Sequence, residues 1–173
     1  TIREGYGQTE SVLQVGTFPG MRVKPGSMGV AAPHFRMAVV GEDGRELGVG
    51  KEGELAIAVR PRRPVGLFSG YWRNAKENRR RFVGRWYLTG DRASRDRDGY
   101  FWFVGRADDV IKSSGYRIGP FEVESALIEH PAVVEAAVVG KPDPLRGAIV
   151  KAFCVLAPGY RPGDALAAEL QEH

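Results

Sequence analysis

The sequence predicts a mixed α+β fold in which a strand-rich part is followed by a smaller α+β domain. Up to Asp108, short apolar runs are separated by turns that contain glycine or proline, which is typical of strands. From Asp109 onwards, β-branched runs alternate with helical periodicity in the order strand, helix, strand, strand, helix. We therefore expect two domains, residues 1–108 and residues 109–173.

The first part is expected to contain short strands joined by tight turns. The segments with strand-like composition are residues 35–40, 53–59, 85–88 and 100–104. The last two are expected to pair as a hairpin, because Asp98 and Gly99 between them form a dipeptide that favours tight turns. Residues 74–82 are polar enough for a short exposed helix.

The second part is expected to contain two helices and a strand pair. Pro120 fits the first turn of a helix, where its missing N–H group is not needed, and Pro131 ends that helix. The expected strands are residues 133–139 and 149–156, with a turn at residues 142–144 between them. Asp164 is expected to cap a last helix that runs to the end of the chain.

Composition and charge limit the classes of function. The 173 residues carry a net charge of +4, with basic runs at residues 60–63 and 79–81. Acids such as Glu77 and Asp91 interrupt any basic stripe, so we expect no nucleic-acid partner, although an anionic small molecule would suit this surface. The single Cys154 excludes an internal disulfide. Because no run resembles a signal peptide or a membrane span, we expect a cytoplasmic protein.

Three short blocks carry the chemistry, and the richest is residues 105–118, which places a paired acid, two arginines and a Ser-Gly-Tyr turn between two strand-like segments. The other two are residues 6–10, Tyr-Gly-Gln-Thr-Glu, and residues 88–91, Leu-Thr-Gly-Asp. In chain order, residues 6–10 are the first block, residues 88–91 the second and residues 105–118 the third. Together they resemble the adenylate-forming (AMP-binding) superfamily, which contains acyl-CoA synthetases, firefly-type luciferases and peptide-synthetase adenylation domains. The chain is most similar to the medium-chain acyl-CoA synthetases.

The resemblance implies a fold and an activity. Residues 1–108 would form the C-terminal portion of the large AMP-binding domain, with a β-barrel-like subdomain and a hairpin, and residues 109–173 part of the small swinging domain. The implied enzyme is an AMP-forming acid–thiol ligase that joins a medium-chain or aromatic carboxylic acid to CoA through an acyl-adenylate, with ATP and Mg²⁺. The family's phosphate loop and catalytic lysine have no counterpart here, so we expect no catalytic residue in this chain, no activity by the chain alone, and self-association through uncovered surface.

The first block is expected to hold the nucleotide. A threonine hydroxyl can donate to a phosphate oxygen, and a glutamate can hold Mg²⁺. In the family this block lies beside the adenine and the α-phosphate. The resemblance therefore assigns Tyr6, Gly7, Gln8 and Thr9 to nucleotide binding and Glu10 to the metal.

Two further positions complete the expected nucleotide site, and one carries a specificity argument. Asp91, expected near the end of a strand, can accept both hydroxyls of a ribose, and Arg106 can reach the same sugar or the phosphate. Gly7 occupies the place where acetate-specialised relatives carry a bulky aromatic residue, which implies a pocket for a longer acid. The alternative is a glycine that a tight turn requires.

The second domain is expected to handle CoA. Asp108 matches the family's hinge, whose backbone pivots the small domain between adenylation and thioester formation. The residues that the resemblance assigns to CoA are Ser114, Gly115, Tyr116 and Arg146. Arg117 resembles a residue that engages the substrate or phosphate, and arginine suits phosphate because its planar fork donates two parallel hydrogen bonds.

Three alternatives remain open at this point. A short-chain or acetyl-CoA synthetase would share the three blocks, although Gly7 weighs against it. An amino-acid adenylation domain that feeds a carrier protein carries a similar run at residues 115–120. A non-catalytic nucleic-acid-binding module would use the basic surface and would bind in a salt-sensitive way. The mitochondrial matrix is the alternative compartment, because related enzymes work there.

Overall fold

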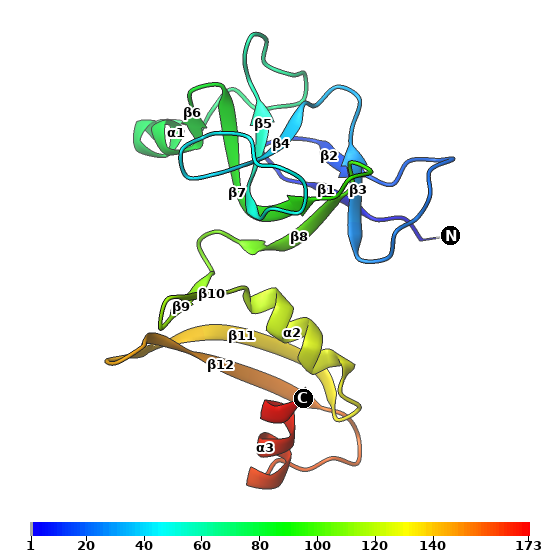
Figure 1. Ribbon diagram of the computed structural model, residues 1–173, viewed down its shortest axis with the longest axis vertical. Helices are drawn as coiled ribbons and strands as arrows, with labels where there is room; N and C mark the ends of the chain where they lie inside the picture. The colour runs from blue at the N-terminus through cyan, green and yellow to red at the C-terminus, as the bar shows by residue number, and fades with distance from the viewer. Residues whose placement is uncertain (1) are drawn as a thin grey trace. The chain divides into compact units, whose positions relative to one another are not determined.

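The computed structural model describes residues 2–173 and divides the chain into two compact units, with the division between Ala107 and Asp108. The sequence placed this division one residue later. A strand-rich unit is followed by a unit with both helices and strands (Figure 1), so the expected mixed α+β fold class is confirmed.

Within residues 2–107, the strands form one mixed-length antiparallel sheet in the order β1-β2-β3-β8-β7-β5-β4, with β6 paired to β7. The strands are β1 (Gly5–Gly7), β2 (Leu13–Gly16), β3 (Ser27–Ala31), β4 (Met37–Val40), β5 (Gly53–Ala58), β6 (Phe82–Val83), β7 (Trp86–Arg95) and β8 (Phe101–Arg106). One helix, α1 (Ala75–Arg81), precedes β6, and the side chain of Asn74 caps it by accepting from the N–H of Glu77.

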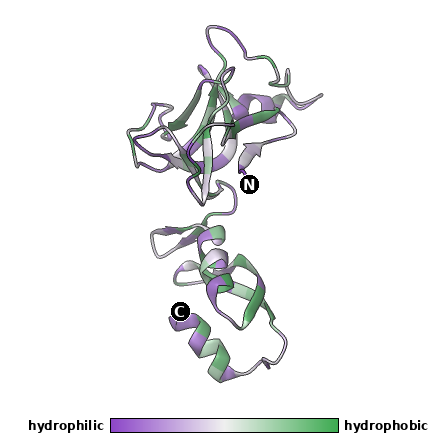
Figure 2. Ribbon diagram, turned by 90° about the vertical axis from the view of Figure 1, so that its right-hand side faces the viewer, coloured by the Kyte–Doolittle hydropathy of each residue, from purple (hydrophilic) through white to green (hydrophobic). Residues whose placement is uncertain are grey.

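Strand β5 explains where the core of this unit lies. Successive side chains of a strand point to opposite faces. Leu55 and Ile57 enter the larger hydrophobic cluster, whereas Ala56 and Ala58 pack into a second cluster with Trp86. The sheet is therefore buried on both sides at its centre, and Figure 2 shows hydrophobic strands joined by more hydrophilic loops.

Strand β7 departs from the prediction in a way that matters for the site. It was expected to end at residue 88 but continues to Arg95, so Asp91 lies in mid-strand rather than near a strand end. In the β5–β7 register, Leu88 faces Ala56 and Arg92 faces Glu54, so three residues of β7 oppose a single residue of β5. This bulge, which includes Gly90 at φ +80°, interrupts the alternation that local sequence patterns rely on.

Residues 108–173 form a four-stranded sheet in the order β10-β9-β12-β11. The elements are β9 (Ile111–Ser113), β10 (Tyr116–Ile118), α2 (Pro120–Glu129), β11 (Val133–Asp143), β12 (Gly147–Leu156) and α3 (Asp164–Glu172). Helix α2 begins at Pro120 as predicted and packs Leu127 against Ile111 and Val138 of the sheet.

Two details of this unit correct the sequence-based expectations. The turn expected at residues 142–144 comes later, because Pro142 and Asp143 still pair with β12 at the edge of the sheet, where a proline is tolerated. Asp164 does not cap α3: the N-cap is Gly163, no side chain bonds the helix start, and Asp164 lies in the first turn.

Candidate functional site

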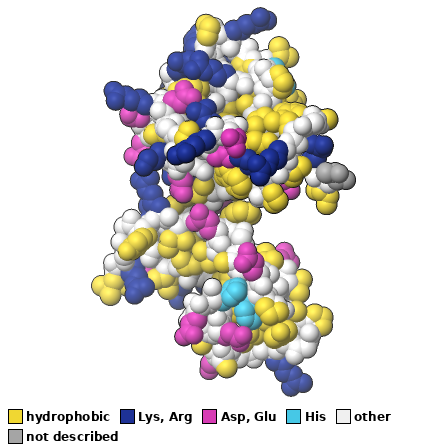
Figure 3. Space-filling view, turned by 45° about the vertical axis from the view of Figure 1, so that its right-hand side comes forward, with side chains coloured by type: hydrophobic (Ala, Val, Ile, Leu, Met, Phe, Trp, Pro, Cys, Tyr) yellow, Lys and Arg dark blue, Asp and Glu magenta, His cyan; other side chains and the backbone are white. Residues whose placement is uncertain are grey.

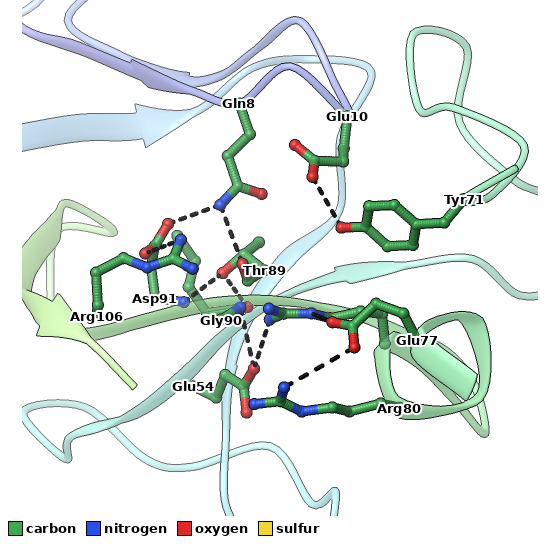
Figure 4. A network of polar contacts seen from close by, with 12 residues as sticks. Gln8, Glu10, Glu54, Tyr71, Glu77, Arg80, Thr89, Gly90, Asp91 and Arg106 are labelled. Carbon is green, nitrogen blue, oxygen red and sulfur yellow. Dashed lines mark hydrogen bonds and ion pairs between the residues drawn. The ribbon is translucent and has the colours of Figure 1, made fainter. Parts of the chain in front are cut away.

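The centre of the candidate site is Asp91, which lies in the bulge of β7. Its carboxylate is almost fully buried, with 5% of the side chain exposed. Arg106 lies directly opposite on β8, and its Nη1 donates to Asp91 Oδ1 at 3.0 Å (Figure 4). The second and third motif blocks therefore meet through a charge-assisted hydrogen bond across two neighbouring strands.

The first motif block reaches the same carboxylate from the other side. The hydroxyl of Tyr6 donates to Asp91 Oδ2 at 2.5 Å, and Nε2 of Gln8 donates to the same oxygen at 2.8 Å and to the carbonyl of Thr89 at 3.0 Å. Burial, and then the neighbouring Asp91, raise the pKa of Tyr6, so its phenol stays protonated as a donor. Residues more than 80 positions apart thus converge on one acid.

The number of donors narrows what Asp91 can accept. A carboxylate has about four lone-pair sites, and Tyr6, Gln8 and Arg106 use three of them. One lone-pair site is therefore left for a further donor, and the expectation that Asp91 accepts both ribose hydroxyls stays a prediction. Gln8 Oε1 beside it is buried without a hydrogen-bond partner among residues 2–173, and this orphaned acceptor suits a second hydroxyl donor.

A polar network that the sequence did not indicate holds the bulge in place. The hydroxyl of Thr89 donates to the carbonyl of Leu55 at 2.7 Å, and the N–H of Gly90 donates to Glu54 Oε1 at 3.0 Å. The buried guanidinium of Arg81 lies behind Gly90 and pairs with Glu77 at 2.8 Å and with Glu54 at 4.0 Å. No local motif marks these residues, because they come from β5, α1 and β7.

Glu10 lies beyond the end of β1, and Tyr71 is its partner. The hydroxyl of Tyr71 donates to Glu10 Oε1 at 2.8 Å (Figure 4). Thr9 is exposed between Gln8 and Glu10. Thr9 and Glu10, the expected phosphate and metal ligands, thus directly follow Gln8 of the Asp91 cluster in the chain. No contact between Tyr71 and Glu10 was expected from the sequence.

The surroundings of Gly7 give this glycine a structural explanation other than the tight turn considered from the sequence. A Cβ atom at this position would lie 2.9 Å from the carbonyl oxygen of Val12 and 3.4 Å from the Cα of Leu13. Close approach of two backbone segments is therefore sufficient to account for a glycine here. The acyl-pocket role of Gly7 stays a prediction.

In the second unit, the residues expected to contact CoA gather at one end of the sheet. Ser114 (φ +48°) and Gly115 (φ +87°) form the two-residue turn between β9 and β10, a geometry that favours glycine at its second position. The N–H of Ser114 donates to the carbonyl of Arg146 at 3.0 Å, which joins this turn to the β11–β12 turn. Tyr116 is 74% exposed beside them, Arg117 follows it on β10, and Asp108 is the first residue of the unit.

The comparison with protein-family models decides the family. Residues 1–72 match the model described as AMP-binding enzyme, and residues 122–173 match the model described as AMP-binding enzyme C-terminal domain. The chain belongs to the AMP-binding, adenylate-forming enzymes. The resemblance drawn from the three motif blocks is therefore confirmed.

Relatives of this AMP-binding chain include acyl-CoA synthetases and CoA ligases. It is 56% identical to the mouse acyl-coenzyme A synthetase ACSM3, mitochondrial, and 58% identical to the rat ACSM5, mitochondrial; each comparison covers 99% of the chain. The chain spans 30% of the length of these relatives.

Among solved structures, it is 36% identical to the anthranilate CoA ligase AuaEII in complex with anthranoyl-AMP, with a TM-score of 0.83, over 98% of the chain and 32% of that structure. A benzoate CoA ligase from Burkholderia xenovorans is 33% identical, with a TM-score of 0.82, over 98% and 33%.

The metal-ligating side chains of this AMP-binding chain could hold a metal ion only together with ligands from another molecule. Among residues 2–173, no three His, Cys, Asp or Glu side chains gather as a metal-binding group. Glu10 keeps one oxygen, Oε2, without a hydrogen bond or ion pair in this described part of the chain. Mg²⁺ is commonly held by one or two carboxylates together with substrate phosphates. The residues therefore fit an Mg²⁺ ion that is bound jointly with a nucleotide.

On the face drawn in Figure 3, the Lys and Arg side chains of the first unit are interspersed with Asp and Glu rather than gathered in one stripe. None of the helices among residues 2–173 combines the length and the apolar character needed to cross a bilayer.

Proposed function

We propose that the protein containing this chain is an AMP-forming acyl-CoA synthetase. The observation that carries the proposal is the convergence of Tyr6, Gln8 and Arg106 on the buried Asp91, because three donors fix a carboxylate beside the block that the family uses for its nucleotide. The relatives support the same activity, since they are acyl-CoA synthetases at 56–58% identity over 99% of the chain.

The proposed reaction has two steps. The carboxylate of the acid attacks the α-phosphorus of ATP and pyrophosphate leaves, which gives an acyl-adenylate. The thiol of CoA then attacks the acyl carbon, loses its proton, and displaces AMP. Both steps depend on positioning and on neutralising phosphate charge.

The first unit would supply the nucleotide contacts, as the C-terminal portion of the large domain, residues 1–108. Asp91 would accept a ribose hydroxyl, and Arg106 would keep Asp91 oriented and reach the sugar or phosphate. Thr9 would donate to a phosphate oxygen, with Tyr6 and Gly7 beside the adenine. Mg²⁺ bound at Glu10 would neutralise part of the charge of the phosphates.

The second unit would handle CoA as part of the swinging domain, residues 109–173. Ser114, Gly115 and Arg146 share the end of the sheet where the two turns meet, which supports a common contact with one ligand. The exposed Tyr116 would add to this CoA surface, and Arg117 would engage the substrate or a phosphate. Asp108 would act as the hinge between the two poses.

The proposed acid is a medium-chain or aromatic carboxylate. Two solved relatives are named as benzoate and anthranilate CoA ligases, which supports an aromatic acid, and the likeness to the ACSM enzymes supports a medium-chain one.

Those ACSM enzymes are named as mitochondrial, so the mitochondrial matrix has support that the cytoplasm lacks. Self-association of the isolated chain stays a prediction, which light scattering after gel filtration would check.

The function is tested by acid-dependent ATP–pyrophosphate exchange with the full-length protein. We expect exchange with octanoate or benzoate to have at least a tenfold higher kcat/KM than exchange with acetate, because each additional buried methylene contributes about 0.8 kcal/mol. A preference for acetate would contradict the open acyl pocket at Gly7. Exchange with amino acids only would indicate a carrier-protein adenylation domain, and no exchange with any acid would contradict the proposed activity.

A further inference from the structure

The segment between β5 and α1 is tied to Glu10 at two points. The hydroxyl of Tyr71 donates to Glu10 Oε1 at 2.8 Å, and the N–H of Phe68 donates to the carbonyl of Glu10 at 2.8 Å. Both the side chain and the backbone of Glu10 are therefore held by residues about 60 positions away. Neither Tyr71 nor Phe68 belongs to the three motif blocks, and the proposed reaction has so far given them no role.

Tyr71 itself is fixed on three sides. The side chain of Asn78 on α1 bonds its backbone twice: Oδ1 accepts from Tyr71 N–H at 2.7 Å, and Nδ2 donates to Tyr71 C=O at 2.9 Å. The ring of Phe68 meets the Tyr71 ring edge-on, with centroids 4.8 Å apart. A phenol held in this way delivers its hydroxyl to one place, so Glu10 receives a donor whose position is set by the fold.

The Tyr71 hydroxyl is the donor of this pair and Glu10 is the acceptor. A phenol hydroxyl carries one hydrogen that it can donate, and a carboxylate oxygen accepts, so the 2.8 Å contact occupies Oε1 of Glu10. The second oxygen, Oε2, accepts no hydrogen bond and forms no ion pair within residues 2–173.

We propose that Tyr71 is a positioning residue for the metal ligand Glu10: it holds Oε1 so that Oε2 is directed at the Mg²⁺ that accompanies the nucleotide phosphates. The proposal rests on the proposed function, because it assumes that Glu10 binds this ion. Carboxylates that ligate metals are commonly oriented by a hydrogen bond from a neighbouring side chain, and removing such a partner typically weakens metal binding about 10- to 100-fold.

The test separates the hydroxyl from the ring. Tyr71→Phe removes only the donor and leaves the packing against Phe68 intact. Tyr100→Phe is the matched control, since the Tyr100 hydroxyl donates to the carbonyl of Arg22 at 2.6 Å and makes no contact with Glu10. Glu10→Gln reports the loss of the ligand itself. Each variant is made in the full-length protein, and binding of Mn²⁺ in the presence of ATP and without acid is followed by the paramagnetic resonance of the free ion. Binding of ATP in EDTA is measured by calorimetry.

We expect Tyr71→Phe to weaken Mn²⁺ binding about tenfold, with ATP binding in EDTA and the Tm equal to those of Tyr100→Phe. Glu10→Gln should weaken Mn²⁺ binding further. Wild-type affinity for Mn²⁺ in Tyr71→Phe, together with a loss in Glu10→Gln, would overturn the role of Tyr71 and leave the proposed function intact. Equal losses with and without metal would make Tyr71 a purely structural residue. Failure of the unaltered protein to bind ATP and Mn²⁺ would overturn both proposals.

Discussion

Replacing Asp91 with asparagine in the full-length protein is expected to lower kcat/KM for ATP in pyrophosphate exchange about 100-fold. Asparagine has the same shape but presents an NH₂ donor where the carboxylate presents only acceptors. The new NH₂ group would therefore point a donor at another donor, which is Arg106 in one orientation and Tyr6 and Gln8 in the other. A hydrogen bond to a charged group contributes up to about 3 kcal/mol, so losing the bond from the ribose hydroxyl to the Asp91 carboxylate corresponds to about two orders of magnitude in kcat/KM.

The matched control for this variant is Asp43→Asn. Asp43 lies in the turn after β4, where its exposed carboxylate accepts from the N–H of Arg45 at 3.0 Å and makes no contact with the Asp91 cluster. We expect unchanged exchange kinetics for Asp43→Asn. If Asp91→Asn kept wild-type kcat/KM while its Tm stayed normal, the assignment of Asp91 to the nucleotide would be wrong.

The local elements of the fold were largely predictable, and the reason is visible in α1 and α2. Asn74 and Pro120 stand at the starts of these helices, and the physical preference of each for that position acts over a few residues. The hairpin of β7 and β8 was predictable for the same reason, since Asp98 and Gly99 form its turn. Such signals depend on neighbours in the sequence, so a reading of the sequence alone can find them.

The arrangement around Asp91 was less predictable, because it depends on contacts between distant segments. The three blocks indicated a shared site through their resemblance to a family, but nothing local showed that Gln8 would donate to both Asp91 and Thr89. The sequence predicted this strand only as far as residue 88, whereas β7 continues through the bulge to Arg95. Tyr71 ends a run, residues 64–71, that resembles the medium-chain acyl-CoA synthetases, but nothing in that run indicated a contact with Glu10.

Gly90→Ala is expected to destabilise the centre of the first unit by about 3 kcal/mol. Gly90 has φ +80°, a left-handed conformation that costs a residue with a side chain about 1 kcal/mol or more. A Cβ there would also lie 2.1 Å from Nη1 of Arg81, which would have to move. Arg81 is buried and pairs with Glu77, and breaking a buried ion pair costs several kcal/mol. In hydrogen exchange followed by mass spectrometry, the amides of β7 should exchange roughly 100-fold faster.

Gly44→Ala distinguishes the two causes of this loss. Gly44 has nearly the same backbone conformation, with φ +73°, but a Cβ there would meet no atom within 4 Å. The control therefore keeps the conformational cost of about 1 kcal/mol and omits the collision with Arg81. If Gly44→Ala accelerated exchange as much as Gly90→Ala, left-handed strain alone would explain both. A clear excess at Gly90 would mean that the Arg81 network behind the bulge holds Asp91 in place, and ATP binding should then weaken in Gly90→Ala and not in Gly44→Ala.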